Sequence, residues 1–126
     1  MKVKTDTKEK FTVIHVETPQ MTANMAAELN NQLRELLKGK TKNVILSLAG
    51  VDLIDEEAAE LLVRTQQKFY DDGASFVLCE LNGPVEDDLD SKNLLELMNV
   101  TPTQSEAWDI VQMEEIEREL LDEDEE

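Results

Sequence analysis

The side chains best suited to chemistry in this sequence are carboxylates, and the most informative of them follow an apolar run. Asp55, Glu56 and Glu57 come after a nearly continuous apolar run at residues 44–48, which only the serine at 47 interrupts, and a short loop. Acids at such a place are typical of a helix start, because Asp55 is a good N-cap and the glutamates favour the positive end of the helix dipole. The same acids could instead be a selected negative patch that a partner binds. The sequence alone leaves both interpretations open.

Residues for catalysis or metal binding are too few to form a recognisable site. His15 is the only histidine and Cys79 the only cysteine, so a zinc cluster and an intrachain disulfide are both excluded. No glycine-rich phosphate loop, Ser/His/Asp set or phospho-receiver arrangement is evident. The acids of residues 86–90 lack the alternating pattern of a calcium loop. We therefore expect no enzyme activity, no cofactor and no metal.

Composition limits the partners. The chain has 126 residues, enough for one domain, with 12 basic and 29 acidic residues and a net charge of −17. Such a charge repels nucleic acid and anionic lipid, so neither nucleic-acid binding nor membrane insertion is expected. No signal-like or spanning apolar segment is present, which together with the lone cysteine indicates a cytoplasmic protein.

The pattern of apolar residues predicts an α/β fold. The run 44–48 has no polar alternation, which is typical of a strand interior to a sheet and covered on both faces. Apolar residues spaced three and four positions apart, with caps at Thr22 and Thr103 and a stop at Gly73, indicate helices. We expect a mixed sheet of four or five strands covered by about four helices. The predicted strands are 2–5, 11–16, 44–48 and 74–80; the predicted helices start at 22, 56, 84 and 103, and the third runs to about 98.

The end of the chain differs from the rest. We expect residues 1–111 to form the domain and residues 112–126 to be an acidic extension of the last helix, with nine acids and one base, Arg118. Apolar residues keep a helical spacing up to Leu121, whereas residues 122–126 should fray. One interpretation is a solubilising tail. The other is an amphipathic arm that docks on a basic partner or on a second copy of the chain in a homodimer.

The loop at residues 48–55 reads Leu-x-Gly-Val-x-x-Ile-Asp, between the apolar run and the acidic helix start. This loop and the order of elements up to Val111 resemble the STAS domain family, which includes the bacterial anti-sigma factor antagonists. The resemblance implies a non-catalytic interaction module in transcription regulation, whose partner is an anti-sigma factor with serine kinase activity. The alternative is a STAS subunit of a transport complex, of the lipid-transport ATPase or anion transporter type.

The family's helix usually opens Asp-Ser/Thr-Ser/Thr-Gly, and its second hydroxyl is phosphorylated. Here Glu56, Glu57 and Ala58 replace the last three residues, so Glu57 stands at the phosphorylation position. A glutamate carries less charge and fewer oxygens than a phosphate, so it mimics phosphate only in part. Ser47 and the turn 18–22 also depart from the family. By analogy, the resemblance places partner binding at Gln20, Thr22, Gly50, Val51, Asp52, Asp55, Glu56, Glu57 and Ala58.

Overall fold

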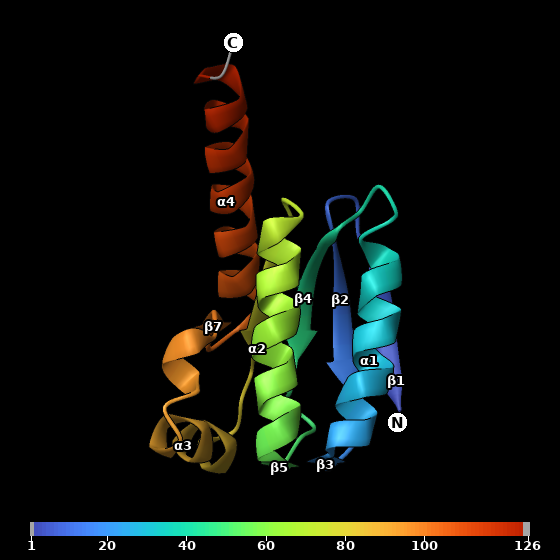
Figure 1. Ribbon diagram of the computed structural model, residues 1–126, viewed down its shortest axis with the longest axis vertical. Helices are drawn as coiled ribbons and strands as arrows, with labels where there is room; N and C mark the ends of the chain where they lie inside the picture. The colour runs from blue at the N-terminus through green and yellow to red at the C-terminus, as the bar shows by residue number, and fades with distance from the viewer. Residues whose placement is uncertain (1, 125–126) are drawn as a thin grey trace.

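A five-stranded mixed sheet forms the centre of the protein, in a computed structural model that describes residues 2–124 (Figure 1). The strand order is β1-β2-β4-β6-β7; β1 and β2 are antiparallel, and the other neighbours are parallel. The expected interior position of residues 44–48 is confirmed, because β4 lies between β2 and β6 and all its residues are buried. The strands are β1 (Val3–Thr7), β2 (Phe11–Val16), β4 (Asn43–Ser47), β6 (Phe76–Cys79) and β7 (Val100–Thr101).

Four α-helices lie within the described residues, as the sequence predicts. They are α1 (Ala23–Leu36), α2 (Glu56–Asp71), α3 (Gly83–Ser91) and α4 (Gln104–Asp124). A short 3-10 helix, η1 (Leu95–Leu97), precedes β7. Two further strands of two residues each, β3 (Gln20–Met21) and β5 (Leu53–Ile54), form a separate parallel pair that the sequence pattern does not reveal.

The two faces of the sheet are covered by different helices, because successive side chains of a strand point to opposite faces. On β4, Leu46 belongs to the large cluster that packs against α1 and α2, where Leu33 and Phe69 are fully buried. Its neighbour Ile45 belongs to a smaller cluster with Ala107 and Val111 of α4. The protein therefore has a larger and a smaller core, separated by the sheet.

The predicted end of the third helix, at about residue 98, is wrong. α3 stops at Ser91, and Asn93 adopts a left-handed conformation with φ of 59°. The backbone N–H of Leu94 then donates to the carbonyl of Leu89 at 3.0 Å, which closes the helix end. Asparagine tolerates this conformation better than most residues, so the polar stretch 91–93 was the overlooked stop signal.

The helix starts follow the caps that the sequence predicts at α1 and α4, and depart from the prediction at α2 and α3. The hydroxyl of Thr22 accepts from the N–H of Met25 at 3.3 Å, and the hydroxyl of Thr103 accepts from the N–H of Glu106 at 3.1 Å. Asp55 occupies the N-cap position of α2, but its side chain makes no capping hydrogen bond. The third helix begins at Gly83 with Asn82 as its N-cap, so Pro84 is one place later than predicted.

The last helix is continuous across residue 111, where the sequence places a domain boundary. α4 has 21 residues and reaches Asp124, further than the expected start of fraying at residue 122, and residues 125–126 lie outside the described part. Within residues 2–124, no helix is both long and apolar enough to cross a membrane.

Candidate functional site

The parallel pair β3 and β5 places the two predicted binding segments side by side. Gln20 pairs with Leu53, and Met21 with Ile54. The carbonyl of Pro19 accepts from the N–H groups of Asp52 and Leu53, at 2.7 and 3.1 Å. Met21 and Ile54 are buried, so the pair is anchored on the core while Gln20 and Leu53 remain exposed. The turn before α1 and the loop before α2 thus form one surface.

The loop before α2 is held in place by close backbone approaches. A Cβ atom on Gly50 would lie 2.9 Å from the carbonyl oxygen of Val16, a distance that real Cβ atoms do not show, so the position requires glycine. The N–H of Val51 donates to the carbonyl of Leu48 at 3.0 Å. The side-chain amide of Asn82 also donates to the carbonyl of Val51 and to Asp52 Oδ1. The start of α3 therefore supports the loop that leads to α2.

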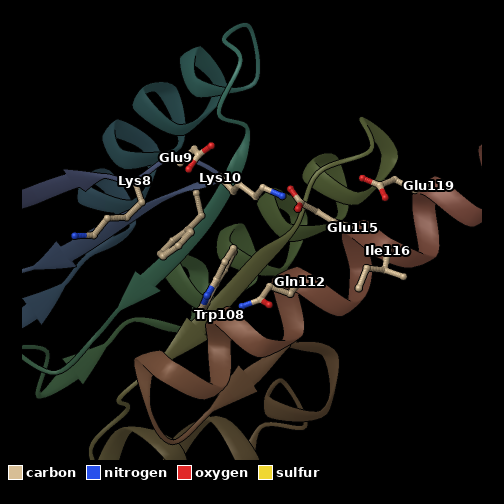
Figure 2. A pocket seen from close by; sticks show the side chains of 9 residues that line it. Lys8, Glu9, Lys10, Trp108, Gln112, Glu115, Ile116 and Glu119 are labelled. Atoms are coloured by element: carbon tan, nitrogen blue, oxygen red, sulfur yellow. The ribbon is translucent and has the colours of Figure 1, made fainter.

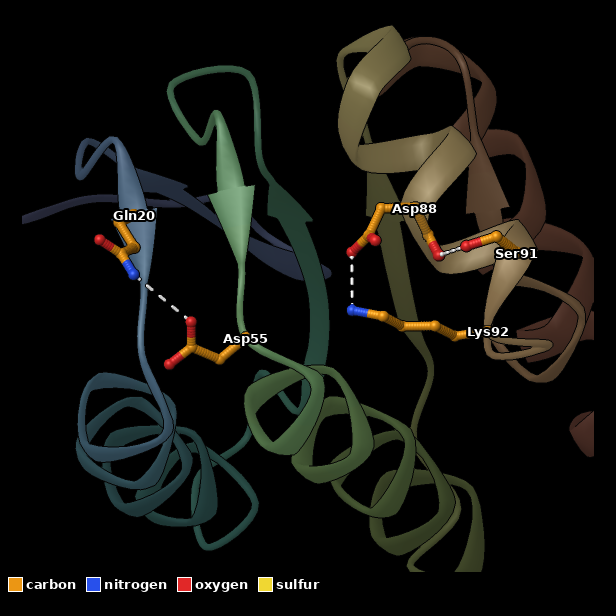
Figure 3. A network of polar contacts seen from close by, with 5 residues as sticks. All are labelled: Gln20, Asp55, Asp88, Ser91 and Lys92. Atoms are coloured by element: carbon orange, nitrogen blue, oxygen red, sulfur yellow. Dashed lines mark hydrogen bonds and ion pairs between the residues drawn. The ribbon is translucent and has the colours of Figure 1, made fainter.

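The carboxylate of Asp55 reaches across to the turn before α1 instead of capping its own helix. Its Oδ1 accepts from Gln20 Nε2 at 3.4 Å (Figure 3). Glu56 and Glu57, in the first turn of α2, are exposed. Within residues 2–124, no ion pair joins any of these three acids to a basic side chain. Their charge is therefore available to a partner.

Burial separates the predicted site residues into two groups. Val51 and Ala58 are fully buried, so their side chains cannot contact a partner, and their role is to pack the loop and helix. The sequence analysis missed Leu53, whose side chain is 52% exposed beside Gln20. No sequence signal could have found it, because a strand of two residues carries too few side chains to show a periodicity. We name the outer group the α2-start surface: Gln20, Thr22, Gly50, Asp52, Leu53, Asp55, Glu56 and Glu57.

A second polar cluster lies at the ends of β4 and β6, on the face of the sheet that α4 covers. Ser47 Oγ donates to Glu80 Oε1 at 3.1 Å, and Cys79 is buried beside them. Burial is the largest cause that raises the pKa of the Cys79 thiol, and together with the nearby Glu80 carboxylate it brings this pKa to about 12. A thiol of this kind stays protonated at neutral pH, so Cys79 is a packed side chain and not a nucleophile.

Metal ligands do not gather anywhere in the described residues: no group of three or more His, Cys, Asp or Glu side chains there could hold an ion. The α2-start surface is thus an exposed, acidic surface with one apolar side chain. Such an arrangement suits recognition of another protein.

Comparison with known sequences and folds agrees with this geometry. The sequence pattern of the STAS domain matches residues 2–107. The chain belongs to the STAS domain family. No curated protein matches this STAS domain in sequence.

Solved structures share the fold. One is a putative anti-sigma factor antagonist from Thermotoga maritima, with 21% identity and a TM-score of 0.72 over 87% of this chain and 94% of that one. An anti-sigma-factor antagonist (STAS) domain protein from Planctomyces limnophilus has 19% identity and a TM-score of 0.73, over 87% and 97%. The murine solute carrier 26 family member A9 anion transporter has 16% identity and a TM-score of 0.69. The match spans 82% of this chain but only 18% of the transporter chain.

Proposed function

We propose that this STAS domain is a non-catalytic interaction module of the anti-sigma factor antagonist type, and that its α2-start surface binds the partner. The observation that carries the proposal is the exposed Leu53 set among four acids, Asp52, Asp55, Glu56 and Glu57. An apolar side chain that becomes desolvated, surrounded by charges that select the partner, is a common arrangement in protein interfaces. The partner is expected to present a basic, partly apolar patch, as an anti-sigma factor with kinase activity could.

Glu57 makes the interaction constitutive in this proposal. It stands at the position where relatives carry the phosphorylated hydroxyl, and a carboxylate cannot be switched by a kinase. Other hydroxyls nearby are poor substitutes, since Ser47 and Thr65 are buried and Thr65 donates to Asn30 Oδ1 at 2.8 Å. A domain held permanently in a released state would have no use, so we propose that Glu57 contacts the partner directly.

Titration calorimetry against purified ATP-binding anti-sigma factors from the same genome tests the role of Glu57. Direct contact predicts that Glu57→Ser binds about threefold to tenfold more weakly, which corresponds to about 0.7 to 1.4 kcal/mol. Stronger binding of Glu57→Ser would instead identify Glu57 as a phosphate mimic that prevents association. Unchanged affinity would mean that Glu57 only stabilises the start of α2 and takes no part in binding. Melting curves of both proteins control for changes in folding.

Leu53 provides a sharper test of the surface itself. Leu53→Gln should weaken binding by about tenfold or more, because it removes the apolar anchor. Leu97→Gln is the matched control, since Leu97 is 53% exposed but lies on η1. If Leu53→Gln binds as tightly as the unchanged protein, the partner uses another surface.

Incubation with the candidate kinase and ATP tests the lost switch. Mass spectrometry should find no phosphate in residues 47–65, and partner binding should be the same before and after incubation. Phosphate at Ser47 or Thr65 with a matching loss of binding would show that the switch has moved.

A transport role is the second candidate, favoured by the similarity of fold to part of an anion transporter. The neighbouring genes discriminate between the two. An ATPase of the histidine-kinase type and a phosphatase support partner switching in the cytoplasm, whereas a permease with its ATPase supports a transport complex.

A further inference from the structure

The second half of α4 extends beyond the body of the domain. A helix of 21 residues is about 31 Å long, and its last turns rise past the ends of α2 and of the strands (Figure 1). Polar contacts tie its inner side to the domain. Tyr70 donates to the carboxylate of Glu114 at 2.6 to 2.7 Å, Asn43 Nδ2 donates to Glu115 at 2.6 Å, and Arg118 donates to Ser75 Oγ at 3.1 Å.

The outer side of the same half carries a row of exposed apolar side chains. Each helical residue turns the chain by about 100°, so Leu120 points roughly opposite to Arg118. Met113, Ile116 and Leu120 share that outer side at spacings of three and four, and they are 60%, 57% and 55% exposed. These three residues are named the α4 stripe. No described element covers it, and contiguous apolar surface of this kind marks interaction sites.

A groove of about 420 Å³ adjoins the stripe and widens the apolar surface. It lies between the β1–β2 hairpin and α4, with Lys8 and Lys10 on the hairpin side and Gln112 and Ile116 on the helix (Figure 2). The rings of Phe11 and Trp108 also line it, stacked with centroids 4.4 Å apart. Ile116 therefore belongs both to the stripe and to the groove wall.

The charges around the stripe select its occupant. Glu117 and Glu119 border the stripe on its two sides, whereas Arg118 is turned inward to Ser75 and Asn43. A second copy of the chain would bring acids against acids, and each chain already carries a net charge of −17. An anionic membrane would be repelled for the same reason. In the groove the charges are mixed, because Glu9, Glu115 and Glu119 line it together with the two lysines. The surface that complements the stripe is therefore apolar with basic flanks.

We propose that the α4 stripe docks an amphipathic helix of a protein partner, with apolar anchors on one side and Lys or Arg beside them. This is a helix-on-helix mode of recognition, in which side chains at spacings of three, four and seven interdigitate. The α2-start surface lies near β3 and β5, at the other end of the long axis (Figure 1). The inference is therefore independent of the proposed function, and one domain can bind two partners at once.

A synthetic amphipathic peptide of about five helical turns, with leucines along one side and lysines flanking them, is the probe. Calorimetry with the full chain should show binding in the micromolar range that weakens as salt is added. The same peptide with glutamates in place of lysines should bind at least tenfold more weakly. Absence of binding by the basic peptide overturns the proposal.

Paired substitutions separate docking from general charge attraction. Ile116→Gln with Leu120→Gln should weaken peptide binding at least tenfold while keeping the helix, because glutamine is a good helix former. Leu97→Gln, equally exposed on η1, should have no effect. Glu117→Gln with Glu119→Gln should weaken binding by about threefold to tenfold. Asp87→Asn with Asp90→Asn, on α3, makes the same change in net charge and should leave peptide binding unaltered.

Two results would overturn the proposal despite peptide binding. Equal affinity of the Ile116/Leu120 variant and the unchanged protein would mean that the peptide binds only through scattered acids. A dimer in sedimentation equilibrium that the same variant dissociates would mean that a second copy occupies the stripe. Circular dichroism of each variant, compared with the unchanged protein, shows whether α4 is intact.

Discussion

The two faces of the sheet differ in how completely they are covered. Two helices, α1 and α2, bury one face in the larger cluster, which also receives side chains from α3. Among the described elements, α4 alone covers the other face; it packs on β4, β6 and β7 and leaves a groove beside β2. The comparison teaches that the stability of the fold depends mainly on the face that α1 and α2 cover, whereas the face that α4 covers leaves surface exposed for recognition.

Adjacent residues of the central strand test this difference most directly. Leu46 faces α1 and α2, Ile45 faces α4, and both are fully buried. Leu46→Ala should lower the free energy of unfolding by about 4 kcal/mol, and Ile45→Ala by about 2 to 3 kcal/mol, because a single covering helix can move inward to fill the space. Urea denaturation measures both. A larger loss for Ile45→Ala would reverse the comparison.

The hydrogen bonds that hold α4 on the domain should contribute less to the free energy of unfolding than either core cluster. Arg118→Met removes the hydrogen bonds to Ser75 Oγ and Asn43 Oδ1, and should cost about 1 to 2 kcal/mol. Hydrogen exchange should also become faster in the second half of α4. Arg34→Met is the control, because Arg34 is exposed at the end of α1 and its loss should change stability by less than about 0.5 kcal/mol. Equal costs for the two variants would mean that Arg118 does not anchor the helix.

Alkaline pH should weaken the α4-covered face through Cys79. Burial raises the pKa of this thiol to about 12 in the folded protein, above the ordinary value of 9.0. A raised pKa contributes stability that is complete below pH 9 and is lost as the pH rises towards 12. Between pH 8 and 10 the loss due to Cys79 should be roughly 1 kcal/mol.

The measurement is the difference in the pH slope of stability between the unchanged protein and Cys79→Ala, because every other titratable group is the same in both. Equal pH slopes for the two proteins would show that burial does not hinder ionisation of the Cys79 thiol. In agreement with its burial, the thiol should also resist an aromatic disulfide reagent at pH 8 until the protein unfolds.

The α4 stripe should contribute least to stability. Leu120→Gln exchanges an exposed side chain for another good helix former, so the free energy of unfolding should change by less than about 0.5 kcal/mol. Thermal and urea denaturation check this. A loss above 1 kcal/mol would show that the stripe packs on the domain, and would remove it as a free docking surface.

Local signals were sufficient for most of the fold. The nearly continuous apolar run at residues 44–48 predicted an interior strand, and Thr22 and Thr103 predicted helix starts, because these signals act within one turn or one strand. The end of α3 was missed because Asn93 is only one of many asparagines that can take a left-handed conformation. Strands of two residues, such as β3 and β5, carry too few side chains for any periodicity.

The structure gathers most of the residues that the resemblance proposes for partner binding, and their role in binding stays a prediction. Sequence resemblance pointed to the turn near Gln20 and the acids from Asp55 to Glu57, which the pairing of β3 with β5 brings to one surface. It could not separate the buried Val51 from the exposed Leu53, because both are apolar residues of one short loop. Exposure depends on which neighbours the rest of the chain supplies.

The sequence by itself determined the alternation of strands and helices, the acidic charge, the family and the glutamate at position 57. These follow from residue type and from spacing along the chain, which act over a few residues. Only the tertiary structure decided that Gln20 bonds to Asp55, that Leu53 is exposed, and that no described element covers the outer side of α4. Each of these depends on contacts between segments far apart in the chain, and such contacts exist only when the whole core has packed.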